Sequence, residues 1–420
     1  MKPLLINTSD IGGAANACIR LHTGLLGAET DSKLLLKEKT RDNIPNSYKV
    51  SITTLRIGLR NKLTKKSRVI LNELGFNYRK KNNDFFWREP GLELCTNPWS
   101  DYDLTSSKLV KEADLINLHW VPNFIDYKSF FKKTDKPVVW TLHDQNPFLG
   151  FEHYQETIIG MDSKGYPITR SISKKERDLN ALYLKLKKDA LSKIDNLHIV
   201  TLCNWMYEEV NHSELFGNFK SYIIPNGIDS EKFKALNKEH CRELLNIPND
   251  KIVFLFVSDS VNNKRKGFAF LEKALKLIDR EDIFLLSVGN KNSTLIQDDK
   301  LNELGYIHDE LLMSIIYSAA DAFIIPSLMD NLPNTAIESL LCGTPVLGFP
   351  VGGLKDIVQH NENGLLAEEI SVPALTNILN IFFENSHKFD SKIIRDNAIK
   401  KYDISVQVQN YLRLYKTIIG

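Results

Sequence analysis

Short apolar runs alternate along the chain with longer stretches of helical periodicity. In the first half these runs are PLLIN (3–7), SKLLL (32–36), DLINLH (114–119), PVVWTL (137–142) and HIVTL (198–202). In the second half they are YIIP (222–225), IVFLFV (252–257), IFLLSV (283–288), AFIIP (322–326) and PVLGF (345–349). Strands that alternate with helices are typical of parallel sheets built from crossover units. The pattern therefore predicts an α/β protein with two domains that meet near Pro225–Asn226.

The C-terminal stretch from Tyr402 to Ile418 has the periodicity of an amphipathic helix. Its apolar positions are Val406, Val408, Tyr411, Leu412, Leu414 and Tyr415. Such a terminal helix is expected to pack back on the first domain. We therefore expect a first domain over residues 1–225, completed by a helix over 398–420, and a second domain over 226–397. Residues 40–105 contain few clear strands, and we expect helices and loops there.

The composition of the chain is that of a folded protein without a disulfide scaffold or a membrane span. A chain of 420 residues with 43% apolar and 25% charged residues suits a folded protein with two cores and disfavours disorder. The five cysteines are scattered without metal-like spacing, which favours reduced thiols over a disulfide scaffold or a zinc site. The N-terminus turns polar too early for a signal peptide, and no run approaches the roughly 18–20 apolar residues of a membrane span. We expect a cytoplasmic protein.

A basic segment over residues 55–81 stands out from the near-neutral net charge of +2. Between Arg56 and Lys81 the single acid is Glu73, and apolar residues such as Leu59 and Leu63 are interleaved with the cations. This pattern predicts either an amphipathic helix that lies on an anionic leaflet or an ordinary basic surface helix. The sequence alone leaves both open.

The strongest local pattern is PSLMDNLPNTAIESLLCGTPV at 326–346. A strand ends, a loop follows, and Pro333 precedes a helix that carries Glu338 and stops at Gly343, a natural left-handed cap. A helix N-terminus with free N–H groups attracts phosphate. Asp330 and Glu338 can therefore address one ligand, Asp330 beside the phosphate end and Glu338 further along. The alternative is that Asp330 caps the helix and Glu338 is a solvated acid.

This block resembles the donor-binding signature of glycosyltransferase family 4, a retaining family with the GT-B fold. The shared pattern is an acid, seven residues, a glutamate and then C-G-T-P-V, here Asp330, Glu338 and LLCGTPV. The resemblance implies that Glu338 binds the ribose hydroxyls and that Asp330 lies against the donor sugar. It also implies donor contacts for Asn331, Leu332, Asn334 and Thr335. The chain departs from the pattern at Asp330, where the usual residue is a glutamate with a longer side chain.

Further segments resemble the family in the correct order. They are YIIPNGIDSEKF (222–233), NKRKGFAFLEKAL (263–275), GYIHDELLMSIIYSAADAFIIPS (305–327), and GFPVGGLKDIV with NENGLLAE (348–368). By resemblance, Tyr306 and Ile307 lie near the nucleobase. The fold class implied is α/β with GT-B architecture: two Rossmann-like domains face each other across a cleft, and the C-terminal helix packs on the first.

Lys266 matches the family's diphosphate-binding lysine. A nucleoside diphosphate gains negative charge as it leaves, and fixed cations stabilise that charge. The partner arginine of the family normally lies about six residues earlier, where this chain has Ser260. Arg265 or Lys264 is a candidate replacement. Without the resemblance, the K-R-K triplet would be interpreted as a solvated basic turn.

The first domain offers a glycine loop and two histidines. In SDIGGAA (9–15) the glycines allow close backbone approach, although the full G-x-G-x-x-G pattern is missing. The resemblance places Gly12 and Gly13 at the cleft floor; the alternative is a simple tight turn. His119 and His143 end strands, where a ligand crevice forms in open α/β sheets. By resemblance His143 touches the donor sugar or the reacting centre, whereas His119 is either an acceptor-side residue or a structural one.

The resemblance implies a retaining glycosyltransferase with a nucleotide sugar, preferably a UDP-sugar, as co-substrate and no other cofactor. The absence of a D-x-D-like motif in a suitable loop agrees with a metal-independent reaction. The expected acceptor is a hydroxyl of a saccharide or a lipid-linked oligosaccharide in capsule or O-antigen synthesis. Membrane contact is expected to be peripheral, through 55–81, and no nucleic-acid partner is expected. The alternatives are a nucleotide-sugar epimerase or hydrolase, and a sensor without enzymatic activity.

Overall fold

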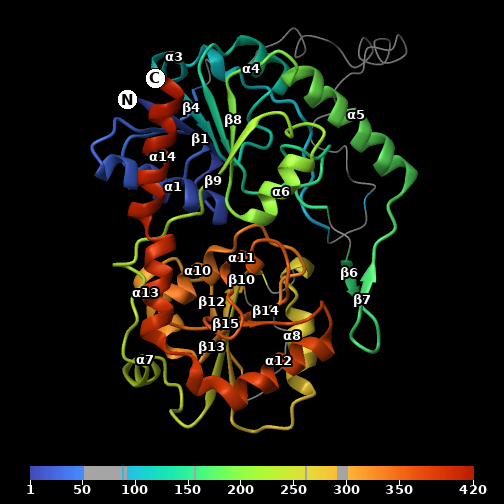
Figure 1. Cartoon of the computed structure of the whole chain (residues 1–420), viewed down its shortest axis with the longest axis vertical. Helices are drawn as coiled ribbons and strands as arrows, with labels where there is room; N and C mark the ends of the chain where they lie inside the picture. Colours follow the sequence, from blue (N-terminus) through green and yellow to red (C-terminus); the bar gives the residue numbers. More distant parts are fainter. Residues whose placement is uncertain (52–87, 89–91, 156–157, 261–262, 291–300) are drawn as a thin grey trace.

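The computed structural model describes residues 1–51, 88, 92–155, 158–260, 263–290 and 301–420. The chain forms two parallel β-sheets that lie one above the other, each flanked by helices (Figure 1). We call the parts built on them the first and the second domain. The whole basic segment 55–81 falls between residues 51 and 88, so its predicted helix lies outside the described residues. No helix in the described ranges has both the length and the apolarity of a membrane span.

The first sheet has seven parallel strands in the order β3-β2-β1-β4-β5-β8-β9. Their bounds are β1 (Pro3–Ser9), β2 (Lys33–Glu38), β3 (Ser47–Lys49), β4 (Leu115–Leu118), β5 (Val138–Thr141), β8 (Leu197–Thr201) and β9 (Lys220–Ile223). The run YIIP, predicted to open the second series of strands, instead contributes to β9 at the edge of this sheet. Helix α6 (Asn204–His212) makes the crossover that sets β9 parallel to β8.

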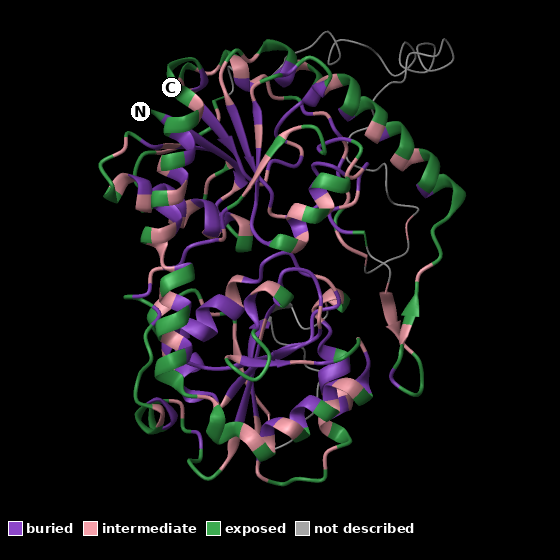
Figure 2. Cartoon of the chain, in the orientation of Figure 1, coloured by how far each residue is buried: buried purple, intermediate pink, exposed green. Residues whose placement is uncertain are grey.

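The second sheet has six parallel strands in the order β12-β11-β10-β13-β14-β15. Their bounds are β10 (Ile252–Ser260), β11 (Ile283–Asn290), β12 (Leu301–Gly305), β13 (Ala322–Ile325), β14 (Val346–Gly348) and β15 (Gly364–Leu366). Parallel sheets are covered on both faces, so their strands read as continuous apolar runs. Burial follows this rule, because the strands lie inside and the outer helix faces are exposed (Figure 2).

Helices connect the strands and cover the sheets. In the first domain they are α1 (Gly13–Gly27), α3 (Lys108–Glu112), α4 (Tyr127–Lys133), α5 (Lys174–Leu191) and α6. In the second they are α7 (Lys238–Leu244), α8 (Phe268–Lys276), α9 (Glu310–Ala319), α10 (Asn334–Leu341), α11 (Leu354–Ile357) and α12 (Val372–Asn385). Two more, α13 (Ser391–Tyr402) and α14 (Ile404–Ile419), end the chain.

The C-terminal helix packs on the first domain, as the periodicity predicts. Helix α14 runs beside α1 (Figure 1), and the Tyr411 and Tyr415 hydroxyls lie 2.8 Å from Thr141 Oγ1 and 2.7 Å from Asn117 Nδ2. Its predicted start at residue 398 is wrong, because α13 continues to Tyr402. The break comes at Asp403, whose carboxylate accepts a hydrogen bond from Ser405 N and so starts a new helix.

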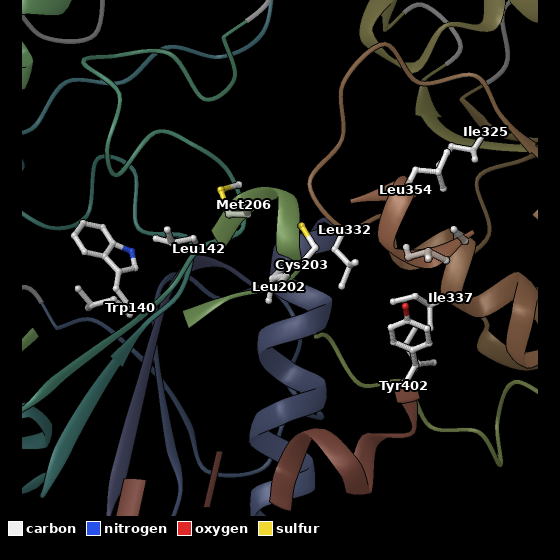
Figure 3. Close-up of a cluster of buried hydrophobic side chains, with 14 of the residues drawn as sticks. Trp140, Leu142, Leu202, Cys203, Met206, Ile325, Leu332, Ile337, Leu354 and Tyr402 are labelled. Atoms are coloured by element: carbon white, nitrogen blue, oxygen red, sulfur yellow. The ribbon is translucent and has the colours of Figure 1, made fainter. Parts of the chain in front are cut away.

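The two domains meet through an apolar contact. Leu142, Leu202, Cys203 and Met206 of the first domain belong to the same buried cluster as Leu332, Ile337 and Leu354 of the second (Figure 3). Apolar side chains of the two domains therefore belong to one buried cluster. The domains are positioned relative to one another by this packing as well as by the chain connection.

A β-hairpin forms a second bridge between the domains. Its antiparallel strands β6 (Ile158–Met161) and β7 (Pro167–Thr169) leave the first domain and lie beside α8 and α12 (Figure 1). Val372 N of α12 donates to Gly165 O at 2.8 Å, and Lys273 Nζ of α8 donates to Ser163 O at 2.7 Å. This hairpin was not predicted from the sequence.

Candidate active site

The site lies where both sheets reverse their strand order. In the first sheet this point is between β1 and β4, and in the second it is between β10 and β13. Loops at the carboxyl ends of strands diverge at such a point and leave a crevice for ligands. Here the two crevices face each other and form one cavity of ≈ 1720 Å³.

The cavity is lined by nearly all of the predicted site residues. They are Gly12, Gly13, His143, Arg265, Lys266, Tyr306, Ile307, Asp330, Asn331, Leu332, Asn334, Thr335 and Glu338. His119 does not line it; it lies behind His143, beside a much smaller cavity. The structure thus brings together residues from distant segments, whereas their individual roles stay predictions.

Lys266 and Asp330 form an ion pair in this cavity. Lys266 Nζ lies 2.6 Å from Asp330 Oδ2, which also accepts a hydrogen bond from Ser327 Oγ at 3.3 Å. Burial raises the pKa of the Asp330 carboxyl, but the charges of Lys266 and Arg265 outweigh it, so the pKa is lowered. Asp330 is therefore an anion whose position is fixed by its neighbours.

Gly267 determines the position of the loop that carries Lys266. Lys266 ends a short 3-10 helix over Lys264–Lys266, and Gly267 follows with φ +71°. A Cβ atom on Gly267 would lie 1.8 Å from the carbonyl oxygen of Pro326, which follows β13. Only glycine allows this close approach, which draws the Lys266 loop against the loop that carries Asp330.

Arg265 also faces the cavity. Its Nη1 atom lies 2.8 Å from Met329 O and 3.7 Å from Asp330 Oδ2, and its Nε atom lies 2.6 Å from Glu93 Oε1. Its guanidinium also lies over the Tyr154 ring, 4.8 Å from the centroid. Arg265 therefore supplies a second cation near Asp330, whereas Ser260 stands at the end of β10. The sequence analysis did not identify Glu93 or Tyr154.

Glu338 is held by residues from both domains. Arg20 Nη2 of α1 lies 2.9 Å from Glu338 Oε1, and the hydroxyl of Tyr317 donates to Oε2 at 3.1 Å. Glu338 is 9% exposed, so the alternative of a solvated helix acid is wrong. The alternative that Asp330 caps α10 is also wrong, because Pro333 occupies the cap position and no side chain caps this helix.

Two asparagines connect the α10 region to the first domain. Asn331 Nδ2 donates to Leu142 O at 2.9 Å, and Asn334 Nδ2 donates to Gly13 O at 3.3 Å. Asn334 also accepts from Asn226 Nδ2 at 2.8 Å. The glycine loop of the first domain is therefore in direct contact with the N-terminal end of α10.

The two strand-end histidines contact each other. His119 Nδ1 lies 2.9 Å from His143 Nε2. Burial lowers the pKa of His143 to about 4, although the Asp144 charge opposes this shift. Burial and the neighbouring His143 also hold the pKa of His119 well below its usual value. Both rings are therefore neutral near pH 7, and one donates its N–H to the other.

A second polar cluster beside His143 was not identified from the sequence. Asp144 Oδ2 accepts from His153 Nδ1 at 2.5 Å and from Trp120 Nε1 at 2.8 Å. These three side chains line the first-domain wall of the cavity. The dipeptide His143–Asp144 was the available signal, because it closely follows the carboxyl end of β5, where a ligand crevice forms.

No group of three His, Cys, Asp or Glu side chains with metal-binding geometry occurs in the part of the chain that the structure describes. Among the charged side chains that line the cavity, Lys266 forms an ion pair with Asp330, and Arg20 forms one with Glu338.

Comparison with known proteins agrees with the two-domain fold. Residues 251–385 match the family model described as Glycosyl transferases group 1. Across their full lengths, this chain and the sucrose-phosphate synthase of Thermosynechococcus elongatus superpose with a TM-score of 0.68 at 18% identity, covering 100% of this chain and 99% of the other. The protein has the GT-B fold.

Two curated relatives match over shorter segments. An uncharacterized glycosyltransferase of Methanocaldococcus jannaschii is 27% identical over 188 residues, 42% of this chain and 48% of the relative. The UDP-Gal:alpha-D-GlcNAc-diphosphoundecaprenol alpha-1,3-galactosyltransferase of Escherichia coli is 26% identical over 227 residues, 50% of this chain and 57% of the relative. The chain thus spans about half the length of these relatives.

Proposed function

We propose that this GT-B protein is a glycosyltransferase that moves a glycosyl group from a nucleotide sugar to an acceptor hydroxyl. The observation that carries the proposal is the shared cavity: Lys266, Asp330 and Glu338, from the region that matches the glycosyltransferase model, face Gly12 and His143 of the other domain. Cations, acids and neutral polar groups suited to the parts of a nucleotide sugar thus surround one space.

The donor is proposed to lie along the second domain. Glu338 accepts the ribose hydroxyls, and Tyr306 and Ile307 lie beside the base. Lys266, Arg265 and the N-terminus of α10 bind the diphosphate, which places the sugar between Asp330 and His143. A UDP-sugar is the favoured donor, in keeping with the name of the Escherichia coli relative. We propose residues 1–225 as the first domain and residues 226–397 as the second domain, which holds the donor.

The chemistry proposed is a metal-independent transfer with retention. The bond between the anomeric carbon and the phosphate oxygen breaks, and its electron pair stays on the diphosphate. Lys266 and Arg265 stabilise that charge. The acceptor oxygen bonds to the same face of the sugar, and its proton passes to the leaving phosphate oxygen. Asp330 is ion-paired with Lys266, which supports a positioning role for this acid over attack on the sugar.

The acceptor is proposed to be a saccharide or a lipid-linked oligosaccharide of capsule or O-antigen synthesis. The Escherichia coli relative is named for a diphosphoundecaprenol acceptor, which supports a lipid-linked substrate. Such a substrate would bring the protein to the cytoplasmic face of a membrane, where segment 55–81 is the proposed contact.

A two-stage experiment tests this function. A thermal-shift screen of UDP- and GDP-sugars first identifies ligands, because a ligand that binds the folded state raises its melting temperature. The stabilising sugar is then incubated with and without saccharide and lipid-linked acceptors. Transfer that requires an acceptor supports the proposal. Isomerised or hydrolysed sugar without an acceptor would favour the epimerase or hydrolase alternative, and binding without any product would favour a sensor.

A further inference from the structure

Arg20 crosses from the first domain into the proposed ribose site. It lies on α1, and its Nη2 atom is 2.9 Å from Glu338 Oε1 and 2.9 Å from Glu310 Oε1. Its side chain is 14% exposed, and the guanidinium lies over the Phe233 ring, 5.5 Å from the centroid. An arginine held by two carboxylates and an aromatic ring in this way has a single well-defined position.

The carboxylate of Glu310, which binds Arg20, is itself held by another side chain. Glu310, at the start of α9, also binds Lys232 Nζ at 2.9 Å through its second oxygen. Burial lowers the pKa of Arg20, but the charges of Glu338 and Glu310 outweigh it and raise the pKa. Arg20 is therefore a permanent cation at the contact between α1 and the second domain.

Glu338 keeps free acceptor capacity despite these contacts. Each oxygen of its carboxylate accepts one hydrogen bond, from Arg20 on one side and from Tyr317 on the other. A carboxylate has about four acceptor positions. Two positions thus remain for a ribose diol, and the side chain that offers them is fixed by one donor from each domain.

We propose that Arg20 is a positioning residue of the nucleotide site, which orients Glu338 toward the ribose hydroxyls. This inference rests on the proposed function, because it requires a ribose beside Glu338. It makes ribose recognition a property of both domains: the hydroxyls contact Glu338 of the second domain, and the orientation of Glu338 depends on α1 of the first. Arg20 itself lies outside the segments that resemble the family.

The test compares a ribonucleotide with its deoxy analogue. Isothermal titration calorimetry measures Kd for UDP and 2′-deoxy-UDP, with GDP and 2′-deoxy-GDP in parallel, for the full-length protein. The variants are Arg20→Ala, Arg20→Gln, Arg20→Lys and Glu338→Gln. Arg413→Ala, at an exposed position of α14, is the matched control for loss of an arginine. A melting curve for each variant establishes that it is folded, and Arg20→Gln replaces Arg20→Ala if the latter unfolds.

Arg20→Ala is expected to weaken UDP binding by roughly tenfold or more, the equivalent of one charge-assisted hydrogen bond. The affinity for 2′-deoxy-UDP should change much less, so that the preference for ribose is lost. Arg20→Lys should restore part of that preference, because lysine keeps the charge but not the planar geometry. Arg413→Ala should resemble the wild type.

Two other results have distinct meanings. If Arg20→Ala weakens both nucleotides equally while Glu338→Gln abolishes the ribose preference, Arg20 only holds the domains together and the inference is wrong. If the wild type binds neither nucleoside diphosphate, or Glu338→Gln leaves the ribose preference intact, the proposed donor site is itself wrong and the role of Arg20 falls with it.

Discussion

The ammonium group of Lys266 and the carboxylate of Asp330 lie 2.6 Å apart, on loops that follow the adjacent strands β10 and β13. One is expected to bind the diphosphate and the other to lie against the donor sugar. Their contact means that the acid fixes the position of the cation. In the proposed donor placement, the diphosphate therefore interacts with Lys266 while Asp330 remains beside this lysine.

Lys266→Ala is expected to lower turnover by about 10²–10³, because a preorganised charge stabiliser is removed. Part of the loss should appear in donor affinity, since the diphosphate is already anionic before the reaction. Loss of the ion pair to buried Asp330 should also lower the free energy of unfolding by about 1–3 kcal/mol. Single-turnover transfer with saturating donor and a urea unfolding curve measure the two effects.

Lys264→Ala is the matched control, because Lys264 is exposed and does not line the cavity. It should leave both quantities near their wild-type values. A folded Lys266→Ala protein with normal turnover would remove this lysine from the mechanism. A larger defect in Arg265→Ala would instead assign the main diphosphate contact to Arg265.

Glu338→Gln is expected to weaken binding of the nucleoside diphosphate by roughly 10-fold to 100-fold. The neutral amide accepts weaker hydrogen bonds than the carboxylate, and a charge-assisted bond contributes roughly 1.5–3 kcal/mol. Titration calorimetry with UDP and GDP measures the change, and Glu362→Gln, at an exposed position of the same domain, is the control. Unchanged affinity would refute the assignment of ribose to Glu338.

Transfer activity is expected to survive EDTA. Lys266 and Arg265 provide two cations near Asp330, and cations so placed can stabilise a leaving diphosphate as a divalent ion would. Initial rates are measured after dialysis against EDTA and again after addition of Mg²⁺ or Mn²⁺. Activity that disappears on dialysis and returns with a divalent ion would contradict the metal-independent mechanism.

The pair of neutral histidines predicts that stability falls in mild acid. The pKa of His143 is about 4 in the folded protein, against 6.5 as its ordinary value, so the unfolded state binds more protons between these values. The contribution of His143 to the free energy of unfolding is therefore fully present above about pH 6.5 and declines as pH falls toward 4. Between pH 7 and pH 5, protonation of His143 in the unfolded state alone should lower the free energy of unfolding by about 2 kcal/mol.

Urea unfolding at pH 7 and pH 5 measures this change. His143→Gln should reduce the difference between the two pH values, whereas His240→Gln, at an exposed position, should leave it as in the wild type. An identical pH dependence in His143→Gln and the wild type would show that other groups cause the acid sensitivity.

Binding of the basic segment 55–81 to acidic lipid is one of the two alternatives that the sequence leaves open, and liposomes test it. Sedimentation with liposomes that contain anionic phospholipid should decrease as salt rises, because screening shortens the field of exposed charges to about 8–10 Å near physiological ionic strength. Liposomes of neutral phospholipid are the control. No binding to acidic liposomes at low salt would favour an ordinary basic surface helix.

Much of the fold could be predicted because its strands are buried on both faces. Runs such as IVFLFV have no polar position, which identifies them without any knowledge of their neighbours. The cavity wall formed by the second domain could also be predicted, because Lys266, Asp330 and Glu338 lie in segments that resemble the glycosyltransferase family. The sheet to which β9 belongs could not, since an edge strand with exposed ends resembles any short apolar run.

The site residues that could not be predicted from the sequence escaped prediction for one physical reason. Arg20 contacts Glu338 318 residues away along the chain, and a single arginine on an amphipathic helix carries no local sign of its partner. Glu93 reaches Arg265 from a stretch without clear periodicity. The hairpin β6–β7 did leave a signal in Asp162–Gly165, a turn-forming sequence in which Gly165 has φ +89°. Its strands, however, are short and half exposed.

The position of α14 has a consequence for synthesis on the ribosome. Its tyrosines complete hydrogen bonds to Asn117 and Thr141 inside the first domain, yet the ribosome makes them after the whole second domain. N-terminal domains usually fold first during translation. Here the second domain can finish its core while the first still exposes the apolar groove beside α1. The nascent chain therefore exposes apolar surface beside α1 until residues 404–419 leave the ribosome. Chaperone binding should concentrate on this surface.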